Sequence, residues 1–559
     1  MARRMPLCDQ GRDRECAPLL GSLADVWVAA ALVMTWVVFT AGSVAPNDLW
    51  WHLRAGEWML AHRTIPQVDL FSYTQAGAPW VYQAWLAEVI LAGVHRAGGV
   101  ALLVAFGAVL TLVGYGLALR AAKIHTGANR RAAALAMLLG MIVGTPAWQV
   151  RPQLLSVALF GALMAVLYAG PDRVRPDRVR AGKARAGRAR GAGDAQVPRA
   201  AWLLPVGFAL WANLHGGFIF GLLALGIQVA AQLWQWLRGE AEREEPPPPA
   251  ATLRDGATQV PRAAWTSLWG KRATFPWAWV AVGLLSLAAT LATPLGTGMV
   301  GYVLGFAQHP VTRNLNMEFA PLNARQGVGI AFLVHLGLLV SLWLWRGHRP
   351  SIRETLLLLA FGGLTLIAVR GVIWYGLATT PMLARAVAEV PMFRREREQR
   401  GIVPINRALV GLLGLAAIVT LPWLRGYLPH PAIDPAHPYL GKDTPVAAVA
   451  ALREMADGDE LRPFHSEAYG SYLIYAAPEI PVFVDTRIEL YPPEQWDDYL
   501  AASSARYDWY ERLHAYGVNL LLLDKERQPD LLEAAQVDGR WELVYEDEAA
   551  AMLALRVSP

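Results

Sequence analysis

VWVAAALVMTWVVFTAGSVAPNDLWWHLRAGEWMLAHR, residues 26–63, joins two segments of opposite character. Residues 26–44 are mostly apolar and long enough for one helix to cross a bilayer. The residues that follow carry an acid, Asp48, and several tryptophans, which are typical of a helix at the membrane–water interface. The stretch therefore predicts a first membrane-spanning helix followed by an amphipathic helix at the membrane surface.

The composition extends this prediction to the whole chain. Of its 559 residues, 55% are apolar and only 17% are charged, and the mean hydropathy is +0.29. A soluble protein carries about 25% charged residues. We therefore expect a polytopic membrane protein. The net charge of +5 and the pI of 9.2 are attributed to membrane topology and not to nucleic-acid binding.

Apolar runs of similar length recur up to residue 425 and predict about eleven membrane-spanning helices. The run 85–97 is too short to cross, so we place it at the interface. The predicted fold class is mainly α: a polytopic transmembrane helical bundle with a small C-terminal α/β domain. The candidate spans are 26–44, 100–119, 132–148, 154–170, 200–213, 217–237, 276–294, 327–345, 354–369, 372–387 and 408–425.

The positive charges give these spans an orientation. The predicted inner segments hold 32 Lys and Arg and the outer loops hold 7, and such residues are retained on the cytoplasmic side. This predicts a cytoplasmic tail over 1–22, a transmembrane domain over 23–425 with its first outer loop at 45–99, and an extracytoplasmic domain over 426–559. The host membrane is expected to be the inner (plasma) membrane. Two inner segments, 171–199 and 238–275, are of low complexity and predict disorder.

The C-terminal domain shows alternating strand and helix patterns, which predict a small α/β fold. It contains no GxGxxG and no P-loop, so nucleotide binding has no support. Asp485 and Arg487 follow a predicted strand, where they could bind a ligand or form an ion pair within the domain. The strand-like segments are 462–466, 481–485, 518–524 and 541–547, and the helical ones are 494–504 and 507–517.

Polar residues gather in the predicted outer loops, although ionisable groups at the membrane edge are costly to bury. They predict one cavity on the outer side. Arginines there suit a phosphate, because the planar guanidinium donates in pairs to its oxygens. An acid could deprotonate an acceptor or hold a divalent ion. Since that compartment lacks nucleotide sugars, we expect the phosphate to be carried by a lipid. The candidate residues are Asp48, His52, Arg54, Arg151, Gln153, Asn213, His215, Glu318 and Arg370.

Each candidate also has a simpler interpretation. Asp48 is a good N-cap for the amphipathic helix. Arg151 could anchor the chain by reaching the lipid headgroups, and His215, before two glycines, could be a turn residue. Arg370 fits least well as a topology signal, since an outward arginine between two short apolar runs goes against the charge bias.

An acid just after the first span, followed by an aromatic amphipathic helix, resembles the GT-C superfamily of membrane glycosyltransferases. The segments NDLWWHLRAGEWML, RPQLLS, WANLHGGFIFG and GSYLIYAAPEIPVFVDTRIELY are similar to a group of bacterial GT-C-like multi-pass membrane proteins. This similarity extends over essentially the whole chain. It implies inverting transfer of a sugar from a polyprenyl-phosphate donor to a glycan, lipid or protein acceptor of the cell envelope, on the outer side of the membrane.

The resemblance also implies roles for individual residues. Asp48 maps onto the catalytic or metal-binding acid of the first outer loop, where a divalent cation such as Mg²⁺ or Mn²⁺ could bind. Many relatives use another acid in the second outer loop, but here that loop reads QVRPQ, so Glu318 or Asp69 would have to serve. By their chemistry, and not by a family motif, the residues expected to bind substrate are His52, Arg54, Arg151, Gln153, Asn213, His215 and Arg370.

Two functions of other classes remain open. A transporter or flippase for a lipid-linked glycan would be built from repeated halves with broken helices, and no internal repeat is found. A non-catalytic assembly protein would depend on its C-terminal domain and not on Asp48.

Overall fold

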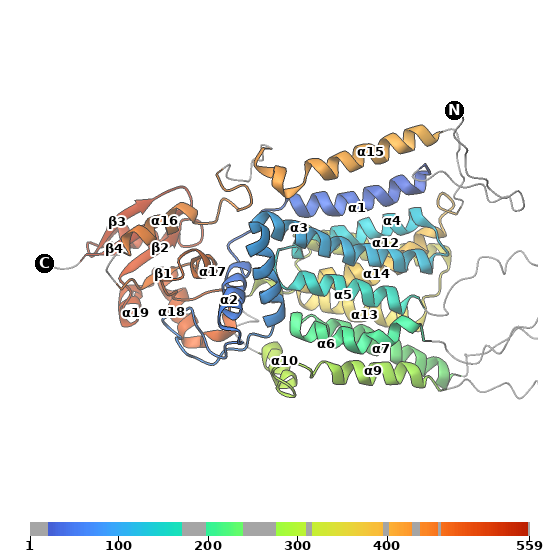
Figure 1. Cartoon of the computed structure of the whole chain (residues 1–559), viewed down its shortest axis with the longest axis horizontal. Coiled ribbons are helices and arrows are strands. Elements are labelled where there is room, and N and C mark those ends of the chain that lie inside the picture. Colours follow the sequence, from blue (N-terminus) through green and yellow to red (C-terminus); the bar gives the residue numbers. More distant parts are fainter. Residues whose placement is uncertain are drawn as a thin grey trace, which may run out of the picture.

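The computed structural model describes residues 21–169, 197–238, 275–308, 316–394, 402–427, 436–456 and 460–556. The predicted disordered segments 171–199 and 238–275, and the tail 1–22, lie almost entirely outside these residues. The described chain is mostly helical, with one small sheet. Its long helices run side by side, and the C-terminal domain lies beyond one end of them (Figure 1). We call this end of the bundle the domain end.

Every predicted span overlaps a helix. In the described part of the chain, four helices are long and apolar enough to cross a membrane, namely α1, α3, α7 and α12, and α5, α9 and α15 are shorter apolar helices. The number of crossings therefore stays a prediction. The bundle comprises α1 (Leu23–Ala41), α3 (Trp85–His125), α4 (Arg130–Gly144), α5 (Gln153–Leu167), α6 (Leu204–Leu214), α7 (Phe218–Leu237), α9 (Trp277–Ala289), α12 (Gly327–Arg346), α13 (Ile352–Ile367), α14 (Val372–Ala388) and α15 (Val403–Val419), with α10 (Gly298–Gln308) near the domain end.

Helix α3 bends where the sequence predicts a boundary between an interfacial helix, 85–97, and a span, 100–119. Its backbone leaves helical geometry at Gly98 and Gly99, and Gly99 has a φ of +63°. That conformation suits glycine, which has no Cβ to clash. The first part of α3 thus turns away from the bundle, where it packs against α2 (Leu49–His62).

The α2–α3 contact depends on a glycine. A Cβ placed on Gly56 would lie 2.1 Å from the carbonyl oxygen of Glu88 and 2.8 Å from the Cβ of Ala92. Because the nearest atom belongs to the backbone, no side-chain rotation can relieve the clash. Gly56 therefore sets how closely α2 approaches α3.

Substituting Gly56 with alanine is expected to destabilise the protein by about 2–3 kcal/mol, since the two helices must separate. Alanine would otherwise favour the helical state over glycine. Gly93→Ala in α3 is the matched control, because nothing lies within 4 Å of its added Cβ. Thermal unfolding of both variants in detergent measures the difference, and equal stability of the two would contradict the close-packing argument.

The connection from α1 to α2 is fixed from both sides. The guanidinium of Arg425 donates to the carbonyl oxygens of Thr40, Ala41 and Gly42 at 3.2, 3.1 and 2.6 Å, which satisfies the last carbonyls of α1. Val44 pairs with the segment that leads into the C-terminal domain, donating to the oxygen of Tyr439 at 2.8 Å. These bonds hold the chain just before Asp48.

The C-terminal domain has a four-stranded sheet of order β1-β2-β4-β3. β1 and β2 are parallel, and β2–β4 and β3–β4 are antiparallel. The predicted α/β fold is therefore observed. The strands are β1 (Pro463–His465), β2 (Leu520–Asp524), β3 (Trp541–Glu546) and β4 (Ala550–Leu555), and the helices are α16 (Val446–Met455), α17 (Glu467–Ala476), α18 (Pro493–Ser503), α19 (Trp509–Ala515) and α20 (Pro529–Val537).

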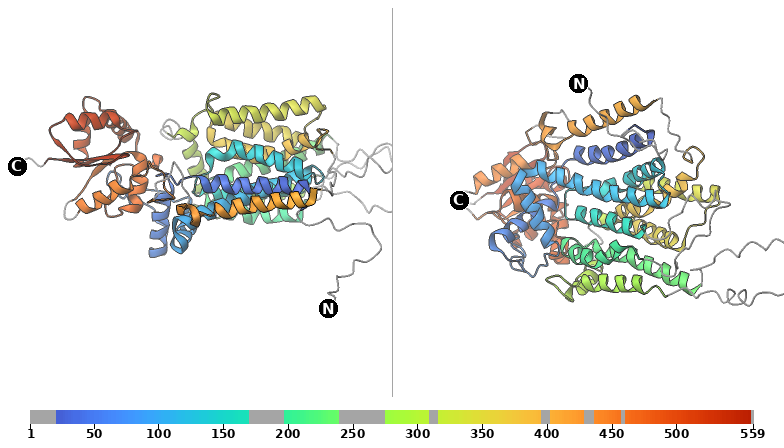
Figure 2. Two further views of the ribbon diagram at one scale, coloured as in Figure 1. Left: turned by 90° about the horizontal axis from the view of Figure 1, so that it is seen from above. Right: turned by 45° about the vertical axis from the view of Figure 1, so that its right-hand side comes forward.

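One predicted strand, 481–485, does not belong to this sheet. It pairs instead with the first outer loop, where Val482 forms an isolated parallel bridge with Ser72. Val482 donates to the oxygen of Phe71 at 3.0 Å and accepts from the amide of Tyr73 at 3.1 Å. The apolar side chains of the segment are thus buried where the C-terminal domain meets the first outer loop. The domain lies against this loop and α2, at the same end of the bundle in two further views (Figure 2).

Candidate functional site at the domain end

Asp48 directly precedes α2 but does not cap it. Its backbone has helical angles, and its carboxyl accepts no hydrogen bond from the amides of the helix. The side-chain oxygen of Asn47 accepts from the amide of Leu49 instead, at 3.4 Å. The N-cap interpretation of Asp48 is therefore wrong, and its carboxyl is available for other contacts.

The first such contact joins three elements. Asp48 lies 3.5 Å from the guanidinium of Arg151, which comes from the turn between α4 and α5. Arg151 also pairs with Glu318, in the short helix η5 (Met317–Phe319). The side chain of Arg151 is 11% exposed, whereas those of Asp48 and Glu318 are 31% and 30% exposed. Arg151 is thus enclosed between two carboxylates, which argues against a lipid-headgroup anchor.

Arg370 lies beside this group. It belongs to η6 (Val369–Gly371), between α13 and α14, and its guanidinium lies over the ring of Phe319 at 4.4 Å from the centroid. Within the part of the chain that the structure describes, its guanidinium makes no hydrogen bond or ion pair. Its charge nevertheless acts on Glu318, Arg151 and Asp48. Arg370 therefore offers an uncommitted cation next to an ion-paired one.

His215 has a defined tautomer. The indole of Trp211 donates to the hydroxyl of Ser156 at 2.7 Å, so the hydroxyl proton is left for Nδ1 of His215 at 2.9 Å. The amide of Gly217 also donates to Nδ1, at 2.9 Å. Because Nδ1 accepts, the neutral ring carries its proton on Nε2. Burial, with the charges of nearby arginines, lowers the pKa of His215 well below its ordinary value, so it is a neutral donor.

His52 is oriented by a buried acid. Its Nδ1 lies 2.9 Å from a carboxyl oxygen of Glu88, whose side chain is fully buried at the start of α3. Burial lowers the pKa of His52 despite this partner. The ring is therefore held in place between α2 and α3, close enough to His215 for the two to interact electrostatically.

The remaining candidates are placed differently. Gln153 is buried as the first residue of α5, two positions after Arg151. Asn213 uses both amide protons on the carbonyl oxygens of Ala209 and Ala292, and its oxygen accepts from an indole, so it joins helices. Arg54 pairs with Glu57 along α2, away from the Asp48 contacts.

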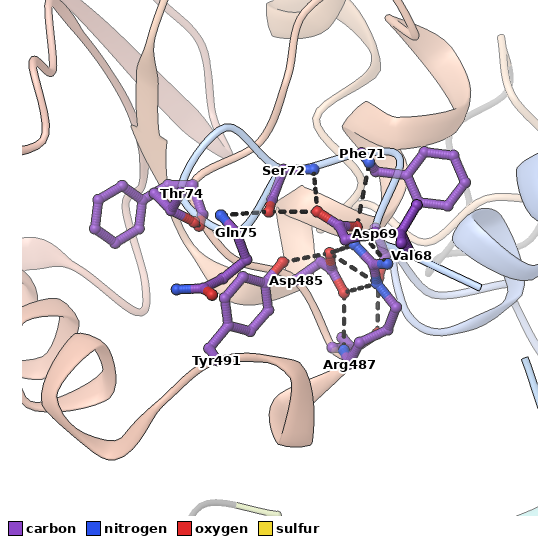
Figure 3. Close-up of polar contacts among 12 residues, drawn as sticks. Val68, Asp69, Phe71, Ser72, Thr74, Gln75, Asp485, Arg487 and Tyr491 are labelled. Carbon is purple, nitrogen blue, oxygen red and sulfur yellow. Dashed lines mark hydrogen bonds and ion pairs between the residues drawn. The ribbon is translucent and has the colours of Figure 1, made fainter. Parts of the chain in front are cut away.

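Asp69, one alternative for a second acid, lies elsewhere. It is fully buried against Arg487 of the C-terminal domain, at 2.7 Å. Arg487 also pairs with Asp485 at 2.6 Å, so the ion pair considered from the sequence exists and reaches beyond the domain. Figure 3 shows these side chains pointing toward one another.

The domain also contributes to the surroundings of Asp48. Burial raises the pKa of Asp48, and the negative charges of Glu318 and Asp485 raise it further. Arg151 and the Thr486 side chain lower this pKa and so offset part of the rise. The arginines hold the pKa of Glu318 below its ordinary value, although burial alone would raise it. Thr486 was not among the residues expected from the sequence. No motif marks it, since its position follows from how the loop and the domain dock.

A metal site gains no support from this geometry. Among the described residues, no group of three or more His, Cys, Asp and Glu side chains is placed to hold a metal ion. Arg151 lies between the two carboxylates that would be the natural oxygen ligands. A divalent cation at Asp48 stays an untested prediction.

Comparison with known proteins finds similarity at the level of the fold and not at the level of the sequence. No protein-family model and no curated protein sequence matches the chain. Among solved structures, ArnT from Cupriavidus metallidurans bound to undecaprenyl phosphate matches with a TM-score of 0.50 and 12% identity, over 95% of this chain and 97% of that one. A mutant form of the arabinofuranosyltransferase AftD from Mycobacteria matches with a TM-score of 0.50 and 15% identity, over 96% and 42%. AglB from Archaeoglobus fulgidus, in complex with an inhibitory peptide and a dolichol-phosphate, matches with a TM-score of 0.49 and 13% identity, over 92% and 72%. The chain has a GT-C-like fold.

Proposed function

We propose that this chain is an integral-membrane glycosyltransferase that moves a sugar from a polyprenyl-phosphate donor to an acceptor at the domain end. One observation carries the proposal: Asp48, Arg151 and Arg370 come from three distant segments and meet at one place. Ion pairing accounts for Arg151 between its two carboxylates, but Arg370 has no ion-pair partner among the described residues, although placing its charge there costs desolvation. The GT-C-like fold supports the same class of reaction.

The cationic part of the site suits the donor phosphate. Arg370 has no competing partner among the described residues, so its planar guanidinium can donate two hydrogen bonds to phosphate oxygens. Arg151 adds a second positive charge, and the Nε2–H of His215 adds a neutral donor. As the bond between the sugar and the phosphate breaks, its electron pair stays with the phosphate. Donors already in place would stabilise that charge.

Asp48 would act on the acceptor. Its carboxyl is partly exposed, and burial raises its pKa, which makes it a better proton acceptor than a carboxylate in water. In the proposed step it takes the proton of an acceptor hydroxyl or amine while that atom bonds to the sugar from the face opposite the phosphate. Inversion at the sugar carbon follows. Glu318 keeps Arg151 oriented and stays ionised, which leaves Asp48 as the base.

The domain boundaries and topology belong to the same proposal. The domain formed by 426–559 would lie outside the cytoplasm and help to position the acceptor, and the N-terminus would be cytoplasmic. The convergent site, the first outer loop 45–99 and the domain all lie at one end of the bundle, which supports this orientation.

The binding test uses Arg370. In Arg370→Ala, affinity for a polyprenyl phosphate is expected to fall by about 10- to 100-fold, because a charged hydrogen-bonding partner is lost. Arg370→Lys keeps the charge without the paired donors, so its affinity should lie between those of the wild type and Arg370→Ala. Arg325→Ala is the control, since this arginine is exposed and no interaction with Asp48 or Glu318 involves it.

Binding is measured by fluorescence titration of the purified full chain with a labelled polyprenyl phosphate. Unchanged affinity in Arg370→Ala would overturn the phosphate assignment. Binding without sugar release from any of a panel of polyprenyl-phosphate sugars would instead favour the lipid-linked glycan transporter.

A further inference from the structure

The segment 485–489, sequence DTRIE, connects the C-terminal domain to the candidate site. Its central residue, Arg487, is fully buried and pairs with Asp69 of the first outer loop and with Asp485 beside it. Tyr491 donates its hydroxyl to Asp485 at 2.6 Å (Figure 3). The segment is therefore fixed to the loop that carries Asp48, so its other side chains have defined positions.

Asp69 is itself held rigidly. It accepts hydrogen bonds from the amides of Phe71 and Ser72 at 3.2 and 3.0 Å and from the Ser72 hydroxyl at 2.6 Å. The rings of Trp51 and Trp80 lie near the guanidinium of Arg487, at 5.8 and 5.5 Å from their centroids. Because one guanidinium pairs with two fully buried carboxylates in this enclosed network, we expect its geometry to be rigid.

Two side chains of the segment, Thr486 and Glu489, interact electrostatically with Asp48. Thr486 acts on the Asp48 carboxyl, and its hydroxyl forms a hydrogen bond of 2.7 Å with the hydroxyl of Ser471. Glu489 lies in the short helix η9 (Ile488–Leu490), in which both neighbours are buried in the domain while Glu489 remains partly exposed. Glu489 is thus turned away from the domain interior.

The groups that face Glu489 come from several elements. Its charge interacts with the first outer loop, with its own segment, with η6 and with α10, which places it within the candidate site. The titratable and charged groups concerned are Asp48, Asp485, Arg487, Arg370 and Tyr302.

We propose that Glu489 is a further acid of this site, beside Asp48 and Glu318, that it is supplied by the C-terminal domain, and that it contacts the bound polyprenyl-phosphate donor next to Arg370. This inference rests on the proposed function. It gives the ion cluster of Asp69, Arg487 and Asp485 a role, which is to position Glu489.

The protonation of Glu489 follows from its surroundings. Burial raises the pKa of Glu489 to about 7, and the negative charges of Asp48 and Asp485 add to the effect. Below that pH the neutral carboxyl can donate a hydrogen bond to an anionic donor. Above it, the ionised carboxyl repels the phosphate and competes for Arg370.

The test compares pH profiles of binding. The full chain in detergent is titrated with a polyprenyl-phosphate hexose, a diester whose single charge does not change near neutral pH. In the wild type, affinity is expected to fall by about tenfold between pH 6 and pH 8.5, as one negative charge appears near the phosphate. Glu489→Gln mimics the protonated form, so its affinity should stay high across the range.

Glu494→Gln is the matched control, because Glu494 is exposed on α18 of the same domain and should leave the wild-type profile unchanged. A profile of Glu489→Gln that falls in parallel with the wild type would overturn the role of Glu489 alone. No binding by the wild type to any donor of a panel at any pH would overturn the proposed function as well. Thermal unfolding confirms that the glutamine variant, which is nearly isosteric, is folded.

Discussion

Replacing Asp48 with asparagine is expected to lower sugar transfer by about 10²- to 10⁴-fold while the protein stays folded. The amide cannot accept a proton from the acceptor, so the step that forms the new bond loses its base. The fold should tolerate the change because Asp48 does not cap α2 and its carboxyl is 31% exposed. The ion pair that it forms among the described residues, to Arg151 at 3.5 Å, is long, and Arg151 keeps Glu318 as a partner.

The measurement is release or transfer of labelled sugar from polyprenyl-phosphate donors by purified protein. Glu57→Gln is a suitable control, since it removes the same charge from the helix that follows Asp48, and Glu57 pairs with Arg54 and not with Arg151 among the described residues. Phosphate binding should persist in Asp48→Asn, because the arginines are untouched. Wild-type transfer in this variant would exclude Asp48 as the base and would favour a non-catalytic function.

The convergence of charges at the domain end could be predicted because burial of charge near a membrane restricts the available arrangements. Asp48, Arg151, Glu318 and Arg370 lie in four loops assigned to one side by the charge bias. Helices long enough to cross force loops on one side to share one end of the bundle. The hydrophobic runs and the distribution of positive charges were therefore sufficient to predict that these residues share one end of the bundle.

The contribution of the C-terminal domain could not be predicted in the same way. Segment 481–485 has the apolar pattern of a strand, but periodicity does not reveal the partner of a strand. Its partner is the first outer loop, at Ser72, roughly four hundred residues away in the chain. The positions of Thr486 and Glu489 follow from that long-range pairing, so they could not be predicted from local sequence patterns.

The misplaced candidates have a related cause. Asn213 has the polarity expected of a binding residue, yet its amide joins α6 to the carbonyl oxygen of Ala292 and to the indole of Trp85. Arg54 shares the outer loop with Asp48, but the helical repeat of α2 turns it toward Glu57. Residue type and side of the membrane thus define the region of the site, whereas side-chain direction depends on packing.

Replacing Arg487 with methionine is expected to destabilise the protein by about 3–5 kcal/mol, because it leaves Asp69 and Asp485 buried without a cation. All three side chains are fully buried, so water cannot take the place of the guanidinium. Asp69→Asn should cost less, since Arg487 retains Asp485 and an asparagine oxygen can still accept from the amides of the loop. Thermal unfolding of the purified chain measures both changes.

Arg512→Met tests whether burial is the cause. Arg512 also pairs with two carboxylates, Asp498 and Asp508, but its side chain is 32% exposed, so water can solvate the partners it leaves behind. Arg512→Met should therefore destabilise the protein much less than Arg487→Met, and equal destabilisation would contradict the argument.

If Arg487 positions Glu489, Arg487→Met measured below its unfolding temperature should also lose the difference in donor affinity between pH 6 and pH 8.5. A destabilised variant with an unchanged pH profile would separate the stability of the cluster from any role in the site.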